Sequence, residues 1–328
     1  MKFIKEKITP EKILVIGAGA WGTAIANHLA TNSHKVVLSS NEPDAIREIN
    51  EEHSNSKFLP KIKLQKSLSA ISGFDLEADY VFIVVPSANA KKLFEKIAKA
   101  KFKKNCIFVI CSKGIEQSSL MILSDAFEKI TRIKNYATLS GPNFATEVAS
   151  GAPTITSIAA RKRKTADKII KLFNNDHFHA RYFKDPRTAE ICGVMKNILA
   201  IGCGIVDGLD LGVNAKAALV MKGISEIQML CKKMKASVEI NSAAGFGDIF
   251  LTCSSAKSRN NSLGKLLAQG KGPEAGKTYE GMVSAKSVSA MAKKMKLQLD
   301  LCETINEIIN HKFSPQEIEK KIISAILK

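Results

Sequence analysis

Residues Ile13–Gly22 read ILVIGAGAWG, an apolar run of strand length that leads directly into three glycines. A helix-compatible segment, TAIANHLA, follows from Thr23 to Ala30. In such a strand–turn–helix, Gly17 permits the sharp bend, Gly19 lets the backbone approach a pyrophosphate, and Gly22 lets helix and strand pack closely. Exposed N–H groups at the helix start favour an anion there without any basic side chain. The stretch therefore predicts a dinucleotide site near the start of the chain.

The end of the second expected strand, Lys35–Ser40, is where dinucleotide enzymes select their cofactor. An acidic residue about twenty positions after the glycines would hold the ribose hydroxyls of NAD, and an arginine would favour the 2′-phosphate of NADP. Glu42 stands at that distance, Asn41 precedes it, and no arginine adjoins it. Glu42 could equally cap a helix or lie on the surface. The sequence therefore leaves NAD and NADP both open as the cofactor.

Further apolar runs of strand length follow, with helix-like segments between them: Tyr80–Pro86, Cys106–Cys111, Tyr136–Ser140, Thr154–Ala160 and Phe178–Phe183. Alternation of this kind predicts an α/β fold with a doubly wound, mostly parallel sheet. From about Thr188 the strand-like runs end, and the chain reads as helices. We therefore expect a Rossmann-like domain over residues 1–187 and an all-helical domain over residues 188–328.

Two lysines occupy positions at which a binding or catalytic role is expected. Lys113 follows the run Cys106–Cys111, at the end of a parallel strand where ligands bind, although a surface charge would fit the same place. Lys196 lies beside Asn197 inside a strongly apolar helix, where an amine is costly unless it is paired, used in chemistry or able to reach solvent at the helix edge. We interpret both lysines as candidate functional groups.

Two polar stretches in the second half add to this set. The segment Ala243–Cys253 contains a second glycine turn that would deliver Asp248 to a ligand, and Ser258, Arg259 and Asn260 follow at the start of a helix. Arginine offers bidentate donors, and a helix start adds free N–H groups, so this combination is suited to phosphate. An ordinary capping loop is the alternative.

The composition is that of a globular α/β protein, with 45% hydrophobic and 6% aromatic residues. The net charge of +18 raises nucleic acid as a partner. However, the basic residues are spread over helix faces without interleaved aromatic residues, so no nucleic-acid partner is expected. A basic surface would instead attract small anionic substrates.

The cysteines and the apolar runs indicate whether the protein has metal sites or disulfides and in which compartment it is expected. The seven cysteines are scattered and form no CxxC pair, so neither a metal site nor a disulfide framework is expected. Most should be buried, and Cys253, which lies near polar residues, is the one exception considered. The segment Met1–Pro10 is too short and too charged for a signal peptide, and no apolar run approaches the length of a membrane helix, so no stable membrane insertion is expected. The sequence therefore favours the cytoplasm.

Seven motifs together make the chain resemble the bacterial-type NAD(P)-dependent glycerol-3-phosphate dehydrogenases over nearly its whole length. They are GAGAWGTAIA at 17–26, SKGIE at 112–116, SGPNFATEV at 140–148, MKNILAIGCGIVDG at 195–208, GFGDIFLTC at 245–253, SRNNSLG at 258–264 and YEG at 279–281. Each motif alone would be weak, but seven in family order are highly specific.

The resemblance implies a role for each matching residue. Lys196 matches the family's catalytic lysine. The positions that hold the substrate match Lys113, Gly141, Asn143, Asp248, Ser258, Arg259 and Asn260. The positions around the dinucleotide match Gly17, Gly19, Ala20, Trp21, Gly22, Asn41, Lys113, Ala145, Arg259, Thr278 and Glu280. Three departures stand out: Ala20 replaces a frequent serine, Asn143 replaces serine or threonine, and Ser39–Asn41 replaces a stretch that often holds tryptophan and a basic residue.

The implied reaction is the reversible reduction of dihydroxyacetone phosphate to sn-glycerol 3-phosphate by NAD(P)H, which supplies the glycerol phosphate backbone of phospholipids. We hypothesise that Lys196 is the acid, that Asp248 orients its amine, that Lys113 polarises the substrate, and that Arg259 with Asn260 clamps the phosphate. A homodimer through the helical domain is also expected. The alternatives are a related dehydrogenase of 3-hydroxy acids or sugar acids, and a non-catalytic dinucleotide-binding regulator.

Overall fold

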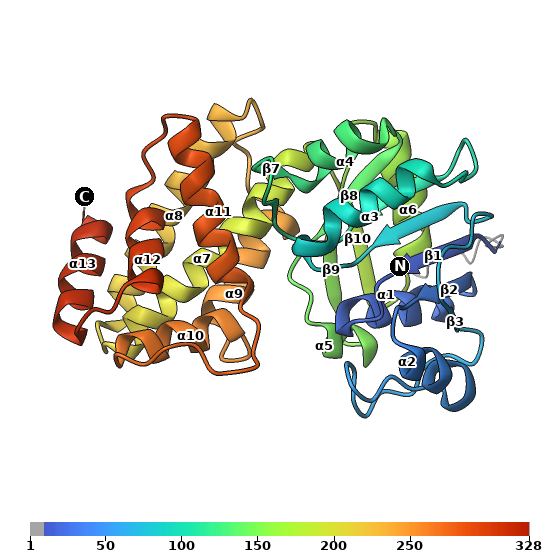
Figure 1. The fold of residues 1–328 in the computed structure, drawn as a ribbon, viewed down its shortest axis with the longest axis horizontal. Coiled ribbons are helices and arrows are strands. Elements are labelled where there is room, and N and C mark those ends of the chain that lie inside the picture. The colour runs from blue at the N-terminus through green and yellow to red at the C-terminus, as the bar shows by residue number, and fades with distance from the viewer. Residues whose placement is uncertain (1–9, 328) are drawn as a thin grey trace. The chain divides into compact units, whose positions relative to one another are not determined.

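The computed structural model describes residues 10–327, and these fall into two units. The sheet unit comprises residues 10–112 and 123–186, and the helical unit comprises residues 113–122 and 187–327 (Figure 1). The charged N-terminal segment that argues against a signal peptide lies, up to residue 9, outside the described residues.

Eight strands form one sheet in the sheet unit, in the order β10-β9-β8-β5-β4-β1-β2-β3. Each neighbouring pair is parallel except β8 and β9, which are antiparallel, so the expected doubly wound, mostly parallel sheet is confirmed. The strands are β1 (Lys12–Ile16), β2 (Lys35–Ser39), β3 (Ser69–Ile71), β4 (Tyr80–Ile83), β5 (Ile107–Ile110), β8 (Tyr136–Ser140), β9 (Thr154–Ala159) and β10 (Phe178–Phe183). The central strands β4 and β5 are wholly buried, as expected for continuous apolar runs in a parallel sheet.

Helices cover this sheet: α1 packs against α5 and α6, and α3 packs against α4. Their bounds are α1 (Ala20–Thr31), α2 (Pro43–Arg47), the π-helix η1 (Glu48–Glu52), α3 (Ser87–Lys99), α4 (Leu123–Thr131), α5 (Ala145–Ala149) and α6 (Arg163–Phe173). Two differences from expectation concern boundaries. The first helix begins at Ala20 rather than Thr23, and the short edge strand β3, which pairs with β2, was not predicted because three residues carry no periodic signal.

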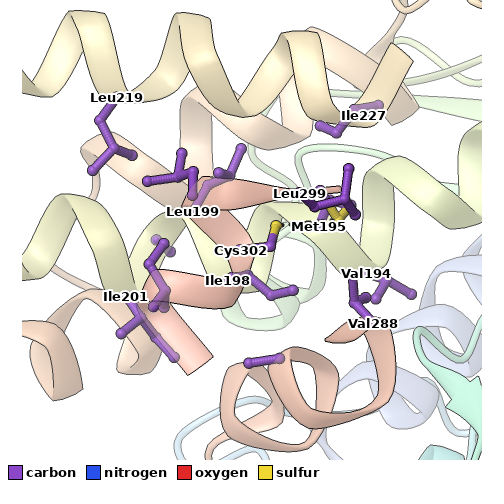
Figure 2. Close-up of a cluster of buried hydrophobic side chains, with 14 of the residues drawn as sticks. Val194, Met195, Ile198, Leu199, Ile201, Leu219, Ile227, Val288, Leu299 and Cys302 are labelled. Carbon is purple, nitrogen blue, oxygen red and sulfur yellow. Dashed lines mark hydrogen bonds between the residues drawn. The ribbon is translucent and has the colours of Figure 1, made fainter. Parts of the chain in front are cut away.

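The helical unit packs its helices around one apolar core. Its elements are β6 (Ile115–Glu116), β7 (Met121–Ile122), α7 (Pro186–Gly208), α8 (Gly212–Lys233), the π-helix η2 (Ala243–Gly247), α9 (Asp248–Ser254), α10 (Arg259–Ala268), α11 (Glu280–Lys294), α12 (Asp300–Asn310) and α13 (Pro315–Leu327). Figure 2 shows Met195, Ile198 and Leu199 of α7 among side chains from α8, α11 and α12. The helix α7 is therefore the central element of this core.

The helix α7 corrects the expectation that no apolar run approaches the length of a membrane helix. An 18-residue window of this helix has a mean hydropathy of 1.6, so it is long and apolar enough to cross a membrane by composition. In the structure, 94% of that window is buried among the other helices of the protein. The apolar run is explained by its central place in the core, which requires apolar residues on every side of the helix.

A ten-residue segment departs from the expected division between residues 187 and 188. The antiparallel pair β6–β7 lies within residues 113–122 and belongs to the helical unit, although the sequence on both sides of it belongs to the sheet unit. Ile115 and Ile122 are buried in the helical core, which explains the placement. The segment begins with Lys113 and so carries this lysine into the helical unit.

Candidate active site

The glycine turn of the sheet unit has the conformation that its sequence predicts. Gly17 has a φ of +115°, which other residues rarely adopt, and a Cβ on it would meet the carbonyl oxygen of Val84. A Cβ on Gly22 would collide with the carbonyl oxygen of Gly17. By contrast, the space above Gly19 is open within 4 Å. The turn thus needs glycine at its two ends for packing and leaves its middle accessible.

The start of α1 offers hydrogen-bond donors beside this opening. Helical bonding begins with the N–H of Thr23, which donates to the carbonyl oxygen of Gly19 at 2.9 Å. The N–H groups of Ala20 and Trp21 come before it and therefore have no acceptor within the helix. Donors of this kind beside an open backbone suit a diphosphate, so the residues present fit the predicted dinucleotide.

Beyond β2, the predicted cofactor-selecting residues lie near the surface. Asn41 is exposed, and the Glu42 carboxylate accepts a hydrogen bond from the Lys57 amine at 2.6 Å. Glu42 occupies the N-cap position of α2 without a side-chain capping bond, and its side chain is 45% exposed, so the alternative of a residue at the helix start on the surface fits the structure. Its carboxylate remains a candidate for the ribose.

The end of β8 carries three further predicted residues. A Cβ on Gly141 would press against Thr156 of the neighbouring strand β9, so glycine is required there for packing. The Asn143 amide donates to the carbonyl oxygen of Ile155 at 2.9 Å, while its own oxygen is buried without a partner among the described residues. Ala145 begins α5 and packs against the core of the sheet unit.

In the helical unit, two lysines share one carboxylate. The Lys196 amine, on α7, donates to Asp248 Oδ1 at 2.7 Å, and the Lys113 amine donates to Asp248 Oδ2 at 2.6 Å. Asp248 is 1% exposed, and the side chains of Lys196 and Lys113 are 11% and 21% exposed. The structure thus brings together three of the predicted residues, with two cations around one anion.

Sequence analysis missed a fourth member of this cluster, Thr252. Its hydroxyl donates to the Asp248 carbonyl oxygen at 2.7 Å and accepts a hydrogen bond from the Lys196 amine at 2.9 Å. Asp248 and Thr252 are four residues apart on α9, so helical spacing could have revealed the pair. The segment predicted as a glycine turn forms η2 and α9 and is kinked at Gly245, whose backbone angles (φ −93°, ψ −108°) are not helical and where a Cβ would meet the carbonyl oxygen of Ile240.

Burial and mutual charge set the protonation of this cluster. Burial lowers the pKa of Lys196 to about 8, since the opposing effect of the Asp248 carboxylate is partly cancelled by the nearby Lys113. Burial also lowers the pKa of Lys113, but its contact with Asp248 outweighs burial and leaves the value raised. For Asp248 itself, burial raises the pKa, and the two ammonium groups more than offset this, so its pKa is lowered. Asp248 is therefore ionised, and Lys196 is the group that titrates nearest neutrality.

A chain of hydrogen bonds ties α10 to the residue after Lys196. The Asn260 amide donates to Asn197 Oδ1 at 3.0 Å, and its oxygen accepts from the backbone N–H of Gly281 at 3.0 Å. Asn197 in turn donates to the Glu280 carboxylate at 3.4 Å. Both polar atoms of the Asn260 side chain are thus engaged within the protein.

The remaining predicted residues flank these helices. Ser258 is the N-cap of α10, and its hydroxyl accepts from the N–H of Asn261 at 3.3 Å. Arg259 is exposed at the first position of α10, and Thr278 is exposed just before α11. The close packing of α7 on α10 sets this geometry, because a Cβ on Gly204 would meet the Asn261 carbonyl oxygen.

Cys253 does not join this chemistry. Its thiol is buried, and a hydrogen bond with Cys203 together with burial raises its pKa well above the usual value, which keeps it protonated. Within residues 10–327, no group of three or more histidine, cysteine or acidic side chains is placed to hold a metal ion.

Comparison with known proteins identifies similar sequences and structures over most of the chain. The model of the N-terminus of NAD-dependent glycerol-3-phosphate dehydrogenases matches residues 12–166, and the model of their C-terminus matches residues 185–320. The chain is 37% identical over 306 residues to the glycerol-3-phosphate dehydrogenase (NAD(P)+) of Parvibaculum lavamentivorans, covering 91% of this chain and 92% of that protein. It is 34% identical over 332 residues to the corresponding protein of Bacillus velezensis, with coverage of 97% and 94%. The crystal structure of a glycerol-3-phosphate dehydrogenase from Coxiella burnetii has a TM-score of 0.90 and 31% identity, covering 96% of this chain and 99% of that chain.

Proposed function

The chain belongs to the family of NAD-dependent glycerol-3-phosphate dehydrogenases, and we propose that Lys196, Asp248, Thr252 and Lys113 carry out its chemistry. It is an NAD(P)-dependent oxidoreductase that reduces dihydroxyacetone phosphate to sn-glycerol 3-phosphate and catalyses the reverse reaction. The product is the backbone from which phospholipids are built. Family membership removes the non-catalytic regulator as an alternative.

The observation that carries the residue assignment is the hydrogen-bond pattern of the Lys196 amine. An ammonium has three N–H donors, and two of them are directed to Asp248 Oδ1 and Thr252 Oγ1. Because the Thr252 hydroxyl donates its own proton to a backbone carbonyl, it is fixed as an acceptor toward Lys196. The third N–H is left to point at a substrate oxygen. This arrangement orients an acid for the carbonyl oxygen of the substrate.

In the reduction, negative charge develops on the ketone oxygen, and Lys196 neutralises it by donating a proton. The bound nicotinamide supplies or accepts the hydride. A pKa of about 8 suits transfer in both directions, because an amine of ordinary basicity would hold its proton too tightly for the reverse reaction. Asp248 remains ionised throughout and holds the amine in place.

Lys113 adds the second cation. With two ammonium groups and one carboxylate, the cluster has one net positive charge before substrate binds. An excess cation favours an anionic substrate and stabilises the developing alkoxide. We assign Lys113 to substrate polarisation for this reason.

The start of α10 is the proposed phosphate anchor. The Arg259 guanidinium offers two parallel donors, and the backbone N–H groups of Arg259 and Asn260 precede the first helical hydrogen bond, in which Ser262 donates to Ser258. Since the Asn260 side chain is engaged with Asn197 and Gly281, its backbone N–H is the group available to phosphate. The assignment of Gly141 and Asn143 to the substrate remains a prediction.

The dinucleotide is assigned to the glycine turn Gly17–Gly22, including Ala20 and Trp21, on the fit described above. Asn41, Ala145, Thr278 and Glu280 remain predicted contacts of the cofactor. We keep both NAD and NADP as candidate cofactors, since the names of the related enzymes include both.

The decisive experiment follows the oxidation of NADH and of NADPH by dihydroxyacetone phosphate. Lys196→Ala should abolish turnover while leaving the Kd for the dinucleotide nearly unchanged, because the amine lies in the helical unit with Asp248. Lys216→Ala is a matched control, since Lys216 forms a partly buried ion pair with Asp207 in the same unit. Near-normal turnover of Lys196→Ala would remove this lysine from catalysis.

Substrate class is tested separately. Arg259→Ala should raise the KM for dihydroxyacetone phosphate but leave the much weaker reaction of unphosphorylated dihydroxyacetone unchanged, because only the phosphate contacts the guanidinium. Equal effects on both substrates would place the phosphate elsewhere. Activity on 3-hydroxy acids in preference to the phosphorylated ketone would restore the alternative substrate class.

A homodimer and a cytoplasmic location complete the proposal. The helix α8 exposes Val213 (79%), Met221 (70%) and Met229 (41%), and a second copy of the chain would cover these apolar side chains. The seven cysteines are all free thiols, as is usual in a reducing compartment. Met221→Lys should lower the mass measured by light scattering from dimer to monomer, whereas Leu76→Lys, at an exposed apolar residue of the sheet unit, should not. A monomeric parent protein would reject the dimer.

A further inference from the structure

Asn55 lies far in sequence from the glycine turn but hydrogen-bonds to the middle of it. Its side-chain Nδ2 donates to the carbonyl oxygen of Ala18 at 2.9 Å and contacts Thr23 Oγ1 at 2.8 Å. Thr23 Oγ1 also donates to the Ala18 carbonyl oxygen, at 3.3 Å. Asn55 has no exposed surface. The turn is thus fixed from below by a buried amide on a different segment of the sheet unit.

The peptide bond explains why this contact matters. In a trans peptide, the carbonyl oxygen and the following N–H point in opposite directions. When Asn55 and Thr23 hold the Ala18 oxygen toward the protein interior, the N–H of Gly19 is turned toward the opposite side. Gly19 is also the residue of the turn on which a Cβ would meet nothing within 4 Å, and it is the N-cap of α1.

We propose that Asn55 is a positioning residue for the dinucleotide, which holds the Ala18–Gly19 peptide so that the turn presents its N–H groups to the diphosphate. The inference rests on the proposed assignment of Gly17–Gly22 to the cofactor. Asn55 would not touch the cofactor; it acts through the Ala18 carbonyl.

The segment that carries Asn55 is itself anchored. The N–H of Leu59 donates to the Asn55 carbonyl oxygen at 2.8 Å, and the Leu59 side chain is buried in the core of the sheet unit. The N–H of Leu64 donates to the carbonyl oxygen of His53, and the N–H of Gln65 donates to Oδ1 of the Asn27 side chain on α1 at 2.8 Å. The loop is therefore attached to α1 at Gln65 and closed around Asn55 by the bond between Leu64 and His53, so it can hold the amide of Asn55 in place.

The unpaired oxygen of Asn55 also argues that the amide serves the turn. Asn55 Oδ1 is buried without a partner among the described residues, which destabilises the fold. An apolar side chain of similar size would avoid that cost but could not donate to the Ala18 oxygen. Asparagine therefore serves position 55 through its side-chain N–H, which donates to the Ala18 carbonyl oxygen.

The test compares Asn55→Ala and Asn55→Asp with the matched control Asn50→Ala. Asn50 makes two side-chain hydrogen bonds to the backbone of Ala70 in the same unit and has no contact with the turn. We expect the two Asn55 variants to raise the Kd for NADH, measured by fluorescence titration, about tenfold, while kcat at saturating NADH and dihydroxyacetone phosphate changes less than about twofold. Asn50→Ala should lower the Tm with an unchanged Kd.

The outcomes separate the two proposals. If the parent protein binds NADH and the Asn55 variants bind it equally well, the positioning role is overturned and the proposed function stands. If the parent protein does not bind NADH, the assignment of the turn itself fails. Should Asn55→Ala fold poorly, Asn55→Ser, which keeps a short donor, must recover part of the affinity for NADH; no recovery in a folded variant would also overturn the positioning role.

Discussion

The titration of Lys196 predicts how the rate depends on pH. Its pKa is lowered to about 8, mainly by burial, and in the proposed mechanism reduction requires the protonated amine. The kcat for reduction of dihydroxyacetone phosphate should therefore be level below pH 8 and fall about tenfold per pH unit above it. Oxidation of glycerol 3-phosphate requires the neutral amine, so its kcat should rise over the same range. Initial rates at saturating substrates in both directions measure this.

Lys196→Arg provides the control for that profile. The guanidinium stays protonated throughout the accessible range, so whatever reduction activity remains should lose its alkaline decline. An unchanged decline in this variant, or a level profile in the parent enzyme, would show that another group controls the rate.

The sequence singled out the groups now proposed as reactive, but it revealed only part of their hydrogen-bond partners. Lys196 could be predicted because an amine in an apolar helix requires an explanation. Its contact with Asp248 was expected, but the contact of the same carboxylate with Lys113 was not, because Lys113 and Asp248 are 135 residues apart and no periodic pattern connects them. Thr252 was missed because a threonine in an apolar helix is unremarkable until its hydroxyl is seen between Asp248 and Lys196.

At the scale of elements, the two glycines of the turn before and within α1 should fail in different ways. Gly22→Ala places a methyl group against the Gly17 carbonyl and should lower the free energy of unfolding by about 1–3 kcal/mol. Gly19 has ordinary extended angles (φ −70°, ψ 179°) and open space, so Gly19→Ala should change stability by less than about 0.5 kcal/mol. Its methyl group would instead occupy the space proposed for the diphosphate, and the Kd for NADH should rise. Urea unfolding and NADH titration of both variants test the distinction, and a Gly19→Ala variant with normal affinity would contradict it.

The β6–β7 turn predicts a pH-dependent contribution to stability. Burial raises the pKa of Glu116, but hydrogen bonds from the hydroxyl and backbone groups of Ser119 and Ser118 outweigh it and lower the pKa to about 2. A carboxylate with a depressed pKa stabilises the fold fully above its ordinary value of 4.5, and this contribution is lost as the pH falls toward 2. Glu116→Gln should therefore cost up to about 3 kcal/mol at neutral pH and less below pH 4.5.

Unfolding in urea at neutral pH and at about pH 3.5 measures that difference. Glu319→Gln, at an exposed glutamate of α13, is the control and should change little at either pH. A cost for Glu116→Gln that is the same at both pH values would show that the carboxylate charge is not what stabilises the turn.

The elements that the sequence predicted are those with long apolar or periodic patterns. The buried strands β4 and β5 and the helix α7 fall in this class. The short strands β3, β6 and β7 were missed because two or three residues carry no period. The segment around Gly245 was interpreted as a turn; it is a kink between two helical pieces, and Gly245 is required there because a Cβ would meet the carbonyl oxygen of Ile240.

At the scale of the whole molecule, the charge predicts a dependence on ionic strength. The chain has 49 lysine and arginine residues against 31 aspartate and glutamate residues, and a positive surface attracts an anionic substrate. The kcat/KM for dihydroxyacetone phosphate should fall as salt is added, because ions screen this attraction, while kcat stays constant. Dihydroxyacetone, which carries no charge, should show no such fall. An equal response of both substrates would indicate a general effect of salt on the enzyme.

The apolar runs of strand length, and their end near residue 188, were enough to predict two architectures, one α/β and one helical. They could not predict that residues 113–122 belong to the helical unit, because this depends on the burial of Ile115 and Ile122 rather than on local pattern. The placement of residues 113–122 in the helical unit has a consequence for the order of folding during synthesis. The β6–β7 pair leaves the ribosome long before α7, so its two isoleucines must wait, without their apolar partners, until residues 187–327 have been made. The helical unit therefore cannot be completed from a contiguous piece of nascent chain, and the later-translated residues 187–327 determine when the earlier segment 113–122 gains its apolar partners.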